Sequence, residues 1–321
     1  SILTAFALQK LLDNLGYYNE LIQVHKPFGY SYNFSKKYLR TTFQCLNSAD
    51  FEKLNQEFDT FILGSDNQMD YEKIQTLIYR YLFNYTDINK KRIIIAGSCG
   101  NLNEKSTNFD IEKVSTLMRT MDYISFREEK GKRLCKKFFD IDSDWILDPV
   151  FMIDKGIYLN MAKKVKPKNK KFVMTYILYS NENKEMIIDY IRKDKKLPII
   201  NFLGNEKAKH FSIFNNQSVE MWLNSIINSE LIITDSYHCC VFAIIFNKPF
   251  VCLKNPKDYS RFESIFKIMK LNYPEIETLT DYKDYKKNNN IDYNKINTII
   301  ENLKNQNIEL IKSILNEDKV T

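Results

Sequence analysis

The chain has 321 residues, 44% hydrophobic and 14% aromatic, which is enough apolar material for two cores at about 150 residues per domain. Charged residues make up 27%, and eight glycines and seven prolines are few, so disordered, fibrous and linker-rich classes are excluded. The net charge of +7 suits an anionic substrate or an anionic membrane surface and is too modest for a dedicated nucleic-acid binder.

Strands and helices alternate through the first half of the chain. Apolar residues at helical spacing run from residue 3 to 15 and end at Gly16. The other expected elements are a short strand at 20–24, a mostly helical stretch at 38–57, strands at 59–63, 91–96, 123–126 and 145–147, and a helix at 127–139. This alternation predicts a parallel, doubly wound α/β sheet.

A lysine-rich stretch at 154–171 is expected to be a solvated linker, after which a second α/β series begins. Its expected strands are 172–178, 197–203, 231–233 and 249–253, and its expected helices are 182–192, 219–228, 237–246 and 262–269. A polar stretch at 281–294 precedes a helix at 296–315. We expect domains at 1–155 and 156–275, with a helical tail at 276–321 that can pack back on the first domain.

Six cysteines lie in or beside apolar runs without CxxC spacing or a paired framework: Cys45, Cys99, Cys135, Cys239, Cys240 and Cys252. The pattern predicts buried free thiols in a reducing compartment and argues against disulfides and a metal site. No run approaches the ~18 apolar residues of a membrane span. No signal peptide is visible, and because the chain begins inside a helical pattern we expect a segment before Ser1.

The most informative stretch is a buried strand at 231–233 followed by Thr234, Asp235 and Ser236 and then by an apolar helix. Ser236 is the expected N-cap, which places His238 in the first helical turn beside backbone N–H groups and the positive end of the helix dipole. This arrangement predicts an anion site that contains an imidazole, at the sheet edge where α/β proteins bind ligands. The alternative is an ordinary core histidine.

Polar clusters follow four of the expected strands, at 64–68, 97–101, 125–128 and 235–238. Each has a plain alternative taken alone: Ser65 and Asp66 can cap a βα turn, Arg127 can be a surface residue, and Asp148 with Pro149 can simply end a strand. An arginine in the first turn of a helix opposes the dipole, which suggests an anion between them. Their conjunction favours a functional site.

The sequence resembles the polysaccharide pyruvyl transferase family, and ordered motifs from about residue 1 to 275 carry the resemblance. They are AFALQKLL with LG at 5–16, DTFILGSDNQ at 59–68, AGSCG at 96–100, ISFREEKG at 124–131, LDPV at 147–150, and TDSYH at 234–238 followed by KPF at 248–250 and RF at 261–262. The chain departs from the family pattern at Cys239, where a small residue is usual, and at Met69 and Asp70, where an aromatic is usual.

The resemblance implies two Rossmann-like domains facing across a cleft, as in GT-B glycosyltransferases. It implies transfer of the enolpyruvyl group of phosphoenolpyruvate to a hexose of a surface-glycan precursor, usually as a pyruvate ketal, with release of phosphate. Phosphoenolpyruvate is then a co-substrate, and neither a further cofactor nor a metal is expected. Whether the product is a ketal or a simple enolpyruvyl ether stays open.

The phosphate and carboxylate of phosphoenolpyruvate need cations and helix N-termini, which the predicted site residues supply. His238 is the expected phosphate ligand or proton donor, and Asp66 is either the base for the acceptor hydroxyl or a structural cap. The remaining expected donor ligands are Arg127, Ser236, Lys257 and Arg261, and the expected acceptor contacts are Ser65, Gln68 and Ser98.

Two alternatives stay open. A GT-B glycosyltransferase with a nucleotide-sugar donor would share the fold and the phosphate site, and a non-catalytic glycan-binding protein would bind sugar without turnover. The acceptor can be lipid-linked, nucleotide-linked or a polymer, and no nucleic-acid partner is expected. We expect a cytoplasmic protein with at most peripheral contact between its lysines and the inner face of the membrane. A homo-oligomer stays open.

Overall fold

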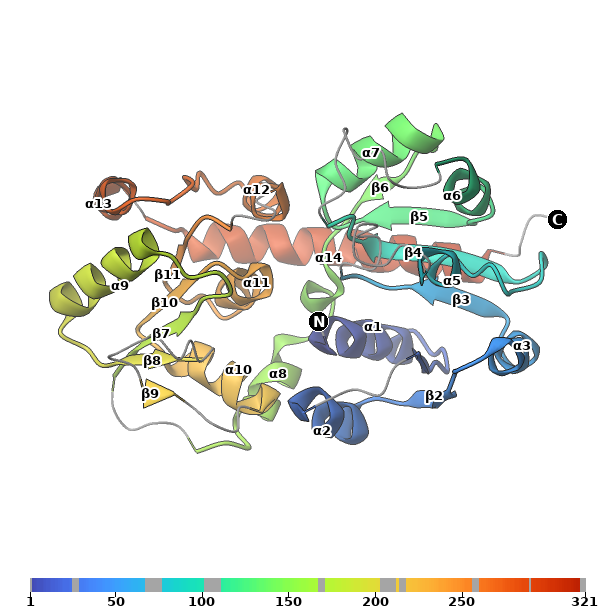
Figure 1. The fold of residues 1–321 in the computed structure, drawn as a ribbon, viewed down its shortest axis with the longest axis horizontal. Helices are drawn as coiled ribbons and strands as arrows, with labels where there is room; N and C mark the ends of the chain where they lie inside the picture. Colours follow the sequence, from blue (N-terminus) through green and yellow to red (C-terminus); the bar gives the residue numbers. More distant parts are fainter. Residues whose placement is uncertain are drawn as a thin grey trace. The chain divides into compact units, whose positions relative to one another are not determined.

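In a computed structural model of the chain, the described residues are 2–24, 29–66, 77–100, 111–166, 171–202, 212–213, 218–255, 260–288 and 290–317. The chain divides into two compact units, and each contains parallel strands and helices in alternation (Figure 1). Unit 1 comprises the described residues up to Ile153 and those from Ile300 onward, and unit 2 is Asp154–Ile299. The tail that we expected as a third region is therefore divided between the two units.

Unit 1 is built on a four-stranded parallel sheet in the order β3-β4-β5-β6 and a separate parallel pair, β1-β2. The strands are β1 (Leu21–Gln23), β2 (Thr41–Gln44), β3 (Thr60–Leu63), β4 (Lys91–Gly97), β5 (Tyr123–Phe126) and β6 (Asp144–Trp145). The prediction of a mostly helical stretch at 38–57 is wrong in its first half, where β2 forms. Threonine and phenylalanine favour a strand there, and the strand pairs with β1.

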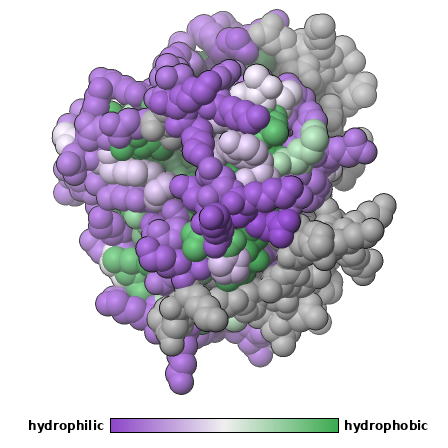
Figure 2. Space-filling model, turned by 90° about the vertical axis from the view of Figure 1, so that its left-hand side faces the viewer, coloured by the Kyte–Doolittle hydropathy of each residue, from purple (hydrophilic) through white to green (hydrophobic). Residues whose placement is uncertain are grey.

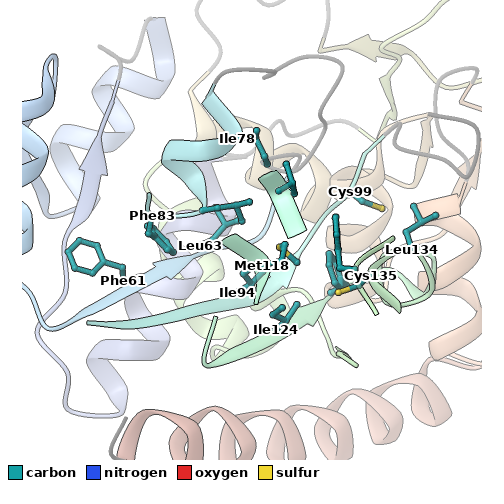
Figure 3. Close-up of a cluster of buried hydrophobic side chains, with 14 of the residues drawn as sticks. Phe61, Leu63, Ile78, Phe83, Ile94, Cys99, Met118, Ile124, Leu134 and Cys135 are labelled. Carbon is teal, nitrogen blue, oxygen red and sulfur yellow. The ribbon is translucent and has the colours of Figure 1, made fainter. Parts of the chain in front are cut away.

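Helices cover this sheet and enclose one apolar core. They are α1 (Ile2–Asn14), α2 (Gly29–Tyr38), α3 (Ser48–Glu57), α5 (Leu77–Tyr81), α6 (Ile111–Met118), α7 (Glu129–Phe139) and the 3₁₀ turn η1 (Pro149–Phe151). Figure 3 shows Leu63, Ile94 and Ile124 of three adjacent strands beside Met118 of α6 and Leu134 of α7. These side chains are each at most 5% exposed, so the sheet end that carries the polar clusters rests on a well-packed support.

Unit 2 holds a five-stranded parallel sheet in the order β11-β10-β7-β8-β9. Its strands are β7 (Val173–Tyr176), β8 (Ile199–Asn201), β9 (Ser212–Ile213), β10 (Leu231–Thr234) and β11 (Phe250–Cys252). Its helices are α8 (Lys155–Ala162), α9 (Glu182–Lys195), α10 (Val219–Asn228), α11 (Tyr237–Ile245), α12 (Ser260–Ile268) and α13 (Leu279–Asn288). The last helix, α14 (Tyr293–Asn316), begins in unit 2 and ends in unit 1.

Two polar segments, one expected to be a linker and one within the expected helical tail, form helices. The lysine-rich linker prediction is wrong at α8, where the Asp154 carboxylate caps the helix by accepting from Gly156 N at 2.6 Å and Tyr158 is fully buried. The polar stretch from 281 is also helical, because α13 buries Tyr282 and Tyr285 beneath its charged face. In both segments a few buried aromatic side chains outweigh the charge pattern.

All six cysteines are buried and free, so the prediction of buried thiols is confirmed. Burial raises the pKa of Cys239 to about 12 and that of Cys135 to about 11. Within the described residues, no helix is long and apolar enough to cross a membrane. The side of the molecule shown in Figure 2 is mostly hydrophilic with small separated hydrophobic areas, and it includes the side on which α9 and α13 lie in Figure 1.

Candidate functional site

The turn between β10 and α11 is built by Thr234, Asp235 and Ser236. The Thr234 hydroxyl donates to Tyr176 O at 2.7 Å and accepts from Ser236 N at 3.0 Å, which fixes the direction in which the chain leaves the strand. Ser236 occupies the N-cap position with extended backbone angles, as predicted, but its side chain makes no capping hydrogen bond. The first turn of α11 is therefore held by the threonine rather than by the serine.

His238 lies in this first turn and is the one residue of α11 that is not buried. Every other residue of the helix packs into the core of unit 2. The imidazole is half-buried against the ring of Tyr237, with ring centroids 5.1 Å apart at 80°. This partial exposure at a helix N-terminus suits an anion site.

Arg261 approaches the same aromatic ring from α12. Its guanidinium carbon lies 5.9 Å from the centroid of Tyr237, and the side chain is half-buried. Phe262, the next residue, is fully buried and packs edge-on against Tyr237 with centroids 6.1 Å apart. Tyr237 thus gathers an imidazole and a guanidinium from two helices, a combination suited to a phosphate. Lys257, which we predicted beside them, lies outside the described residues.

Arg127 follows β5 in unit 1, and its guanidinium is completely buried. Its Nη1 donates to Asp148 Oδ2 at 2.7 Å and to Ser65 Oγ at 3.0 Å, and the Ser65 hydroxyl donates to the same carboxylate oxygen at 3.2 Å. The alternative of a surface arginine is wrong. The structure joins three strand ends here, because Ser65 follows β3, Arg127 follows β5 and Asp148 follows β6.

Two further carboxylates approach the same guanidinium. Asp66 Oδ1 lies 3.7 Å from Nη2, and Glu128 Oε1 lies 3.6 Å from Nε. Glu128 is 1% exposed and is held by the Ser98 hydroxyl and by Cys99 N at 3.2 Å. When all are ionised, three negative charges surround one positive charge, so an added anion must displace a carboxylate or meet a protonated one.

Asp66 differs from the other members of the cluster. Its side chain is 27% exposed, while those of Asp148 and Arg127 are fully buried. Its φ of +109° lies in a region that non-glycine residues rarely adopt, and such strain often marks a functional position. Of the predicted acceptor contacts, Ser65 and Ser98 are buried and bonded within the cluster, and Gln68 lies outside the described residues.

Sequence reasoning missed a second buried ion pair, between Lys184 of α9 and Asp235 of the β10–α11 turn. The two side chains are 4% and 0% exposed, with Nζ 2.6 Å from Oδ2. They are 51 residues apart in the chain, and nothing local in the sequence links them. Glu128 was part of a recognised motif, but its bond to Ser98 across 30 residues was equally invisible. Within the described residues, no group of three or more histidine, cysteine, aspartate or glutamate residues could hold a metal ion.

The family model described as polysaccharide pyruvyl transferase matches residues 1–257 of this chain. A search of curated proteins gave no match. The match includes the turns that carry Ser65, Arg127 and Asp148 as well as the α11 helix with His238, and it ends before Arg261.

Solved structures with a similar fold cover nearly the whole chain. S. aureus MnaA, in a co-structure with UDP, has a TM-score of 0.60 and 13% identity, over 98% of this chain and 94% of that one. UDP-GlcNAc 2-epimerase from Neisseria meningitidis, bound to UDP-GlcNAc, has a TM-score of 0.59 and 11% identity over 98% and 97%. MurG from Acinetobacter baumannii has a TM-score of 0.50 and 10% identity over 97% and 96%. The fold is α/β of the GT-B type, with two Rossmann-like units, as predicted.

Proposed function

The chain belongs to the polysaccharide pyruvyl transferase family, and from this premise we propose that it transfers the enolpyruvyl group of phosphoenolpyruvate to a hexose of a surface-glycan precursor. The product is a pyruvate ketal, and phosphate is released. The observation that carries the proposal is the half-buried His238 at the first turn of α11, with the Arg261 guanidinium near the same Tyr237 ring.

The chemistry of phosphoenolpyruvate suits this corner of unit 2. Its phosphate is bound by the N–H groups and dipole at the start of α11 and by the guanidinium of Arg261. The imidazole of His238 can bind the phosphate as a cation or give up a proton near neutral pH. Ser236 at the N-cap and Lys257 complete the donor ligands that we propose.

The reaction breaks and forms bonds in a balanced order. Protonation of the methylene carbon creates a cationic centre at C2, which the first sugar hydroxyl attacks as it loses its proton. Departure of phosphate regenerates the centre, and the second hydroxyl attacks in the same way. Two C–O bonds to the sugar replace the carbon–carbon double bond and the bond from C2 to the phosphate oxygen. The two hydroxyl protons end on the methyl group and on phosphate.

Unit 1 supplies the remaining proposed roles. We assign Asp66 to the acceptor hydroxyl proton, because it is the exposed and strained carboxylate of its cluster. Arg127 is the proposed further donor ligand. A bound anion would have to displace one of the carboxylates that contact its guanidinium, which are those of Asp148 at 2.7 Å, Glu128 at 3.6 Å and Asp66 at 3.7 Å.

The main rival is a glycosyltransferase that uses a nucleotide-sugar donor. It has the same fold, and two of the similar solved structures are of proteins bound to UDP or UDP-GlcNAc. At 10–13% identity the likeness concerns the fold alone. The rival predicts thermal stabilisation of the chain by a nucleotide sugar and none by phosphoenolpyruvate.

The test is phosphate release from phosphoenolpyruvate with a panel of hexose acceptors, for the wild type, His238→Ala and Arg261→Ala. We expect release that depends on the acceptor and that falls by about 10²–10⁴-fold without the imidazole, the usual contribution of general acid–base catalysis. Arg192→Ala is the matched control, since Arg192 on α9 pairs with Asp189 at the surface of unit 2. No release with any acceptor, together with stabilisation by a nucleotide sugar, would favour the rival.

A further inference from the structure

The carboxylate of Asp235 is a junction between loops at the ligand-binding edge of the unit 2 sheet. It is fully buried and accepts hydrogen bonds from Leu178 N at 2.6 Å and Tyr179 N at 3.0 Å, both in the turn after β7. The third donor is the Lys184 ammonium at 2.6 Å. A carboxylate with this number of donors is fixed in one orientation.

The main-chain oxygen of Asp235 adds a third loop to the junction. It accepts from Asn255 Nδ2 at 2.8 Å, and Asn255 follows β11. Because β11, β10 and β7 are neighbours in the sheet, Asp235 joins the carboxyl ends of three adjacent strands (Figure 1). His238 lies three residues after Asp235 in the chain, so the hydrogen bonds of Asp235 fix the position of the imidazole.

Lys184 is the exceptional residue of α9. The helix carries the exposed residues Glu182, Glu185, Lys193 and Lys195, yet Lys184 is 3% exposed. Its ammonium also donates to Tyr179 O at 2.7 Å. A lysine is almost never buried unless it is paired, so its place is explained by Asp235 rather than by the surface of the helix.

We infer that Lys184 and Asp235 are positioning residues for the anion site at His238, where they hold its turn in place and keep the buried charge beneath it neutral. This inference rests on the function proposed above for His238. Neither residue touches the donor; both act through the β10–α11 turn.

The opposite charges of Lys184 and Asp235 predict that substitutions of the two residues have non-additive effects on anion binding. In the wild type the ammonium balances the carboxylate, so the pair adds little net field at the start of α11. Lys184→Met keeps the length of the side chain and leaves a buried carboxylate that opposes a bound phosphate. Asp235→Asn removes the charge and keeps the size of the side chain, with the loss of one of its two backbone hydrogen bonds, and the double variant restores neutrality. Residues in direct contact give such non-additive effects, whereas independent sites do not.

The experiment measures the affinity of the full chain for phosphoenolpyruvate and for inorganic phosphate by calorimetry, together with KM and kcat. We expect Lys184→Met to weaken both anions and raise KM by about tenfold, a typical size for coupling between contacting groups, with a smaller change in kcat. In the double variant most of the lost affinity should return. Lys254→Met is the control, because Lys254 pairs with Glu277 at the surface of unit 2.

Unchanged anion affinity in Lys184→Met, or a double variant weaker than either single one, would overturn the inference. A melting curve for each variant separates loss of folding from loss of affinity, and the double variant keeps the test decisive if one single variant is unstable. The phosphate measurements do not need turnover. The expected pattern without acceptor-dependent release would therefore refute the proposed function and leave the role of the pair standing.

Discussion

Single residues decide the character of the polar cluster in unit 1. Arg127 has no exposed side-chain surface and is bound to an equally buried Asp148. A pair of this kind adds little net stability when it is complete, but loss of Asp148 leaves the buried guanidinium without its tightest partner. The tight contact is therefore also the most sensitive point of the turn that carries Asp66.

Asp148→Ala should lower the free energy of unfolding by about 1–3 kcal/mol, because the buried guanidinium loses its tightest hydrogen-bond partner and Val150 N loses its cap, while the carboxylates of Glu128 and Asp66 stay near the positive charge. Urea denaturation measures the change. Asp142→Ala is the matched control, since Asp142 pairs with Lys136 at the surface and its side chain is 89% exposed. Equal effects of the two substitutions would show that the buried pair is not what holds this turn.

At the scale of elements, the contact between α7 and β5 depends on one glycine. A Cβ at Gly131 would lie 2.5 Å from Cδ1, 2.6 Å from Cγ and 2.8 Å from Cβ of Phe126, and Phe126 is 2% exposed. The helix can approach the strand this closely only because position 131 has no side chain. The same contact supports Arg127, which directly follows Phe126.

Gly131→Ala should therefore destabilise the protein by about 1–3 kcal/mol through overpacking, although alanine is the better helix former. Thermal unfolding compares it with Lys132→Ala, an exposed neighbour on the same helix that should change stability little. Phe126→Leu in the Gly131→Ala background should return part of the loss, because it removes ring atoms from the clash. A Gly131→Ala variant as stable as the wild type would contradict the close contact.

Helix α13 carries a pH-dependent cap at its start. Asp281 Oδ2 accepts from Thr278 N at 2.7 Å and Glu277 N at 3.1 Å, and the Thr278 hydroxyl accepts from Asp281 N at 3.3 Å. The Thr278 backbone N–H and then its hydroxyl hold the pKa of Asp281 below its ordinary value of 3.8. A lowered carboxylate pKa stabilises the folded state above the unfolded-state value, and this stability is lost as pH falls through the folded-state value.

Asp281→Ala should accordingly lower the melting temperature at pH 7, while its difference from the wild type should shrink as the pH falls below 3.8. Melting curves from pH 7 to pH 3 test this. Asp284→Ala on the same helix is the control, since its carboxylate faces solvent beside Lys287. A difference that stays constant with pH would mean that the charge of Asp281 does not contribute.

Many of the helices and strands could be predicted from the sequence. The bounds expected for β5 and α10 agree with the observed ones, because both have clear apolar periodicity and β-branched or capping residues at their ends. The helix α8 was missed because the lysines that follow it, from Lys163 onward, made the whole stretch at 154–171 look like a linker. In α13, lysine, asparagine and aspartate dominate the composition and hide the buried Tyr282 and Tyr285. A local sequence pattern reveals the exposed, charged face of a helix more readily than it reveals a single buried aromatic residue.

In the candidate site, too, some features could be predicted from the sequence and others could not. The places of His238 and Arg261 at the starts of helices follow from local pattern and could be predicted. The partners could not: Arg127 meets Asp148 across 21 residues and Asp235 meets Lys184 across 51. Such contacts depend on strand order, and a single sequence leaves strand order open.

At the scale of the whole molecule, α14 is anchored in unit 1 by polar contacts that lie far apart in the sequence. The buried Lys91 of β4 donates to the main-chain oxygens of Ile314 and Glu317, at the C-terminal end of the helix. Asn307 accepts from Leu147 N at 3.0 Å, directly beside the Asp148 turn. A lysine at a helix C-terminus also interacts favourably with the negative end of the helix dipole.

Lys91→Met should loosen the end of α14 and leave unit 2 unchanged, because the lost contacts lie within unit 1. Hydrogen exchange read by mass spectrometry should show faster exchange over residues 310–317 and no change in α9 or α10. Lys90→Met is the adjacent control, since the Nζ of Lys90 lies 3.6 Å from the Asp59 carboxylate, a contact that does not involve α14. Equal exchange in the two variants would contradict the anchoring role of Lys91.

The shared helix also bears on the order in which a ribosome can complete the two units. N-terminal domains generally fold first during synthesis. Here the first unit includes residues from Ile300 onward, so Leu147 N and Lys91 gain their partners only after Asn307, Ile314 and Glu317 have been made. Unit 2, which ends at Ile299, can be finished earlier. During that interval unit 2 can be complete while unit 1, whose N-terminal residues were made first, still lacks the end of α14. Chaperone protection of this protein matters most at that time.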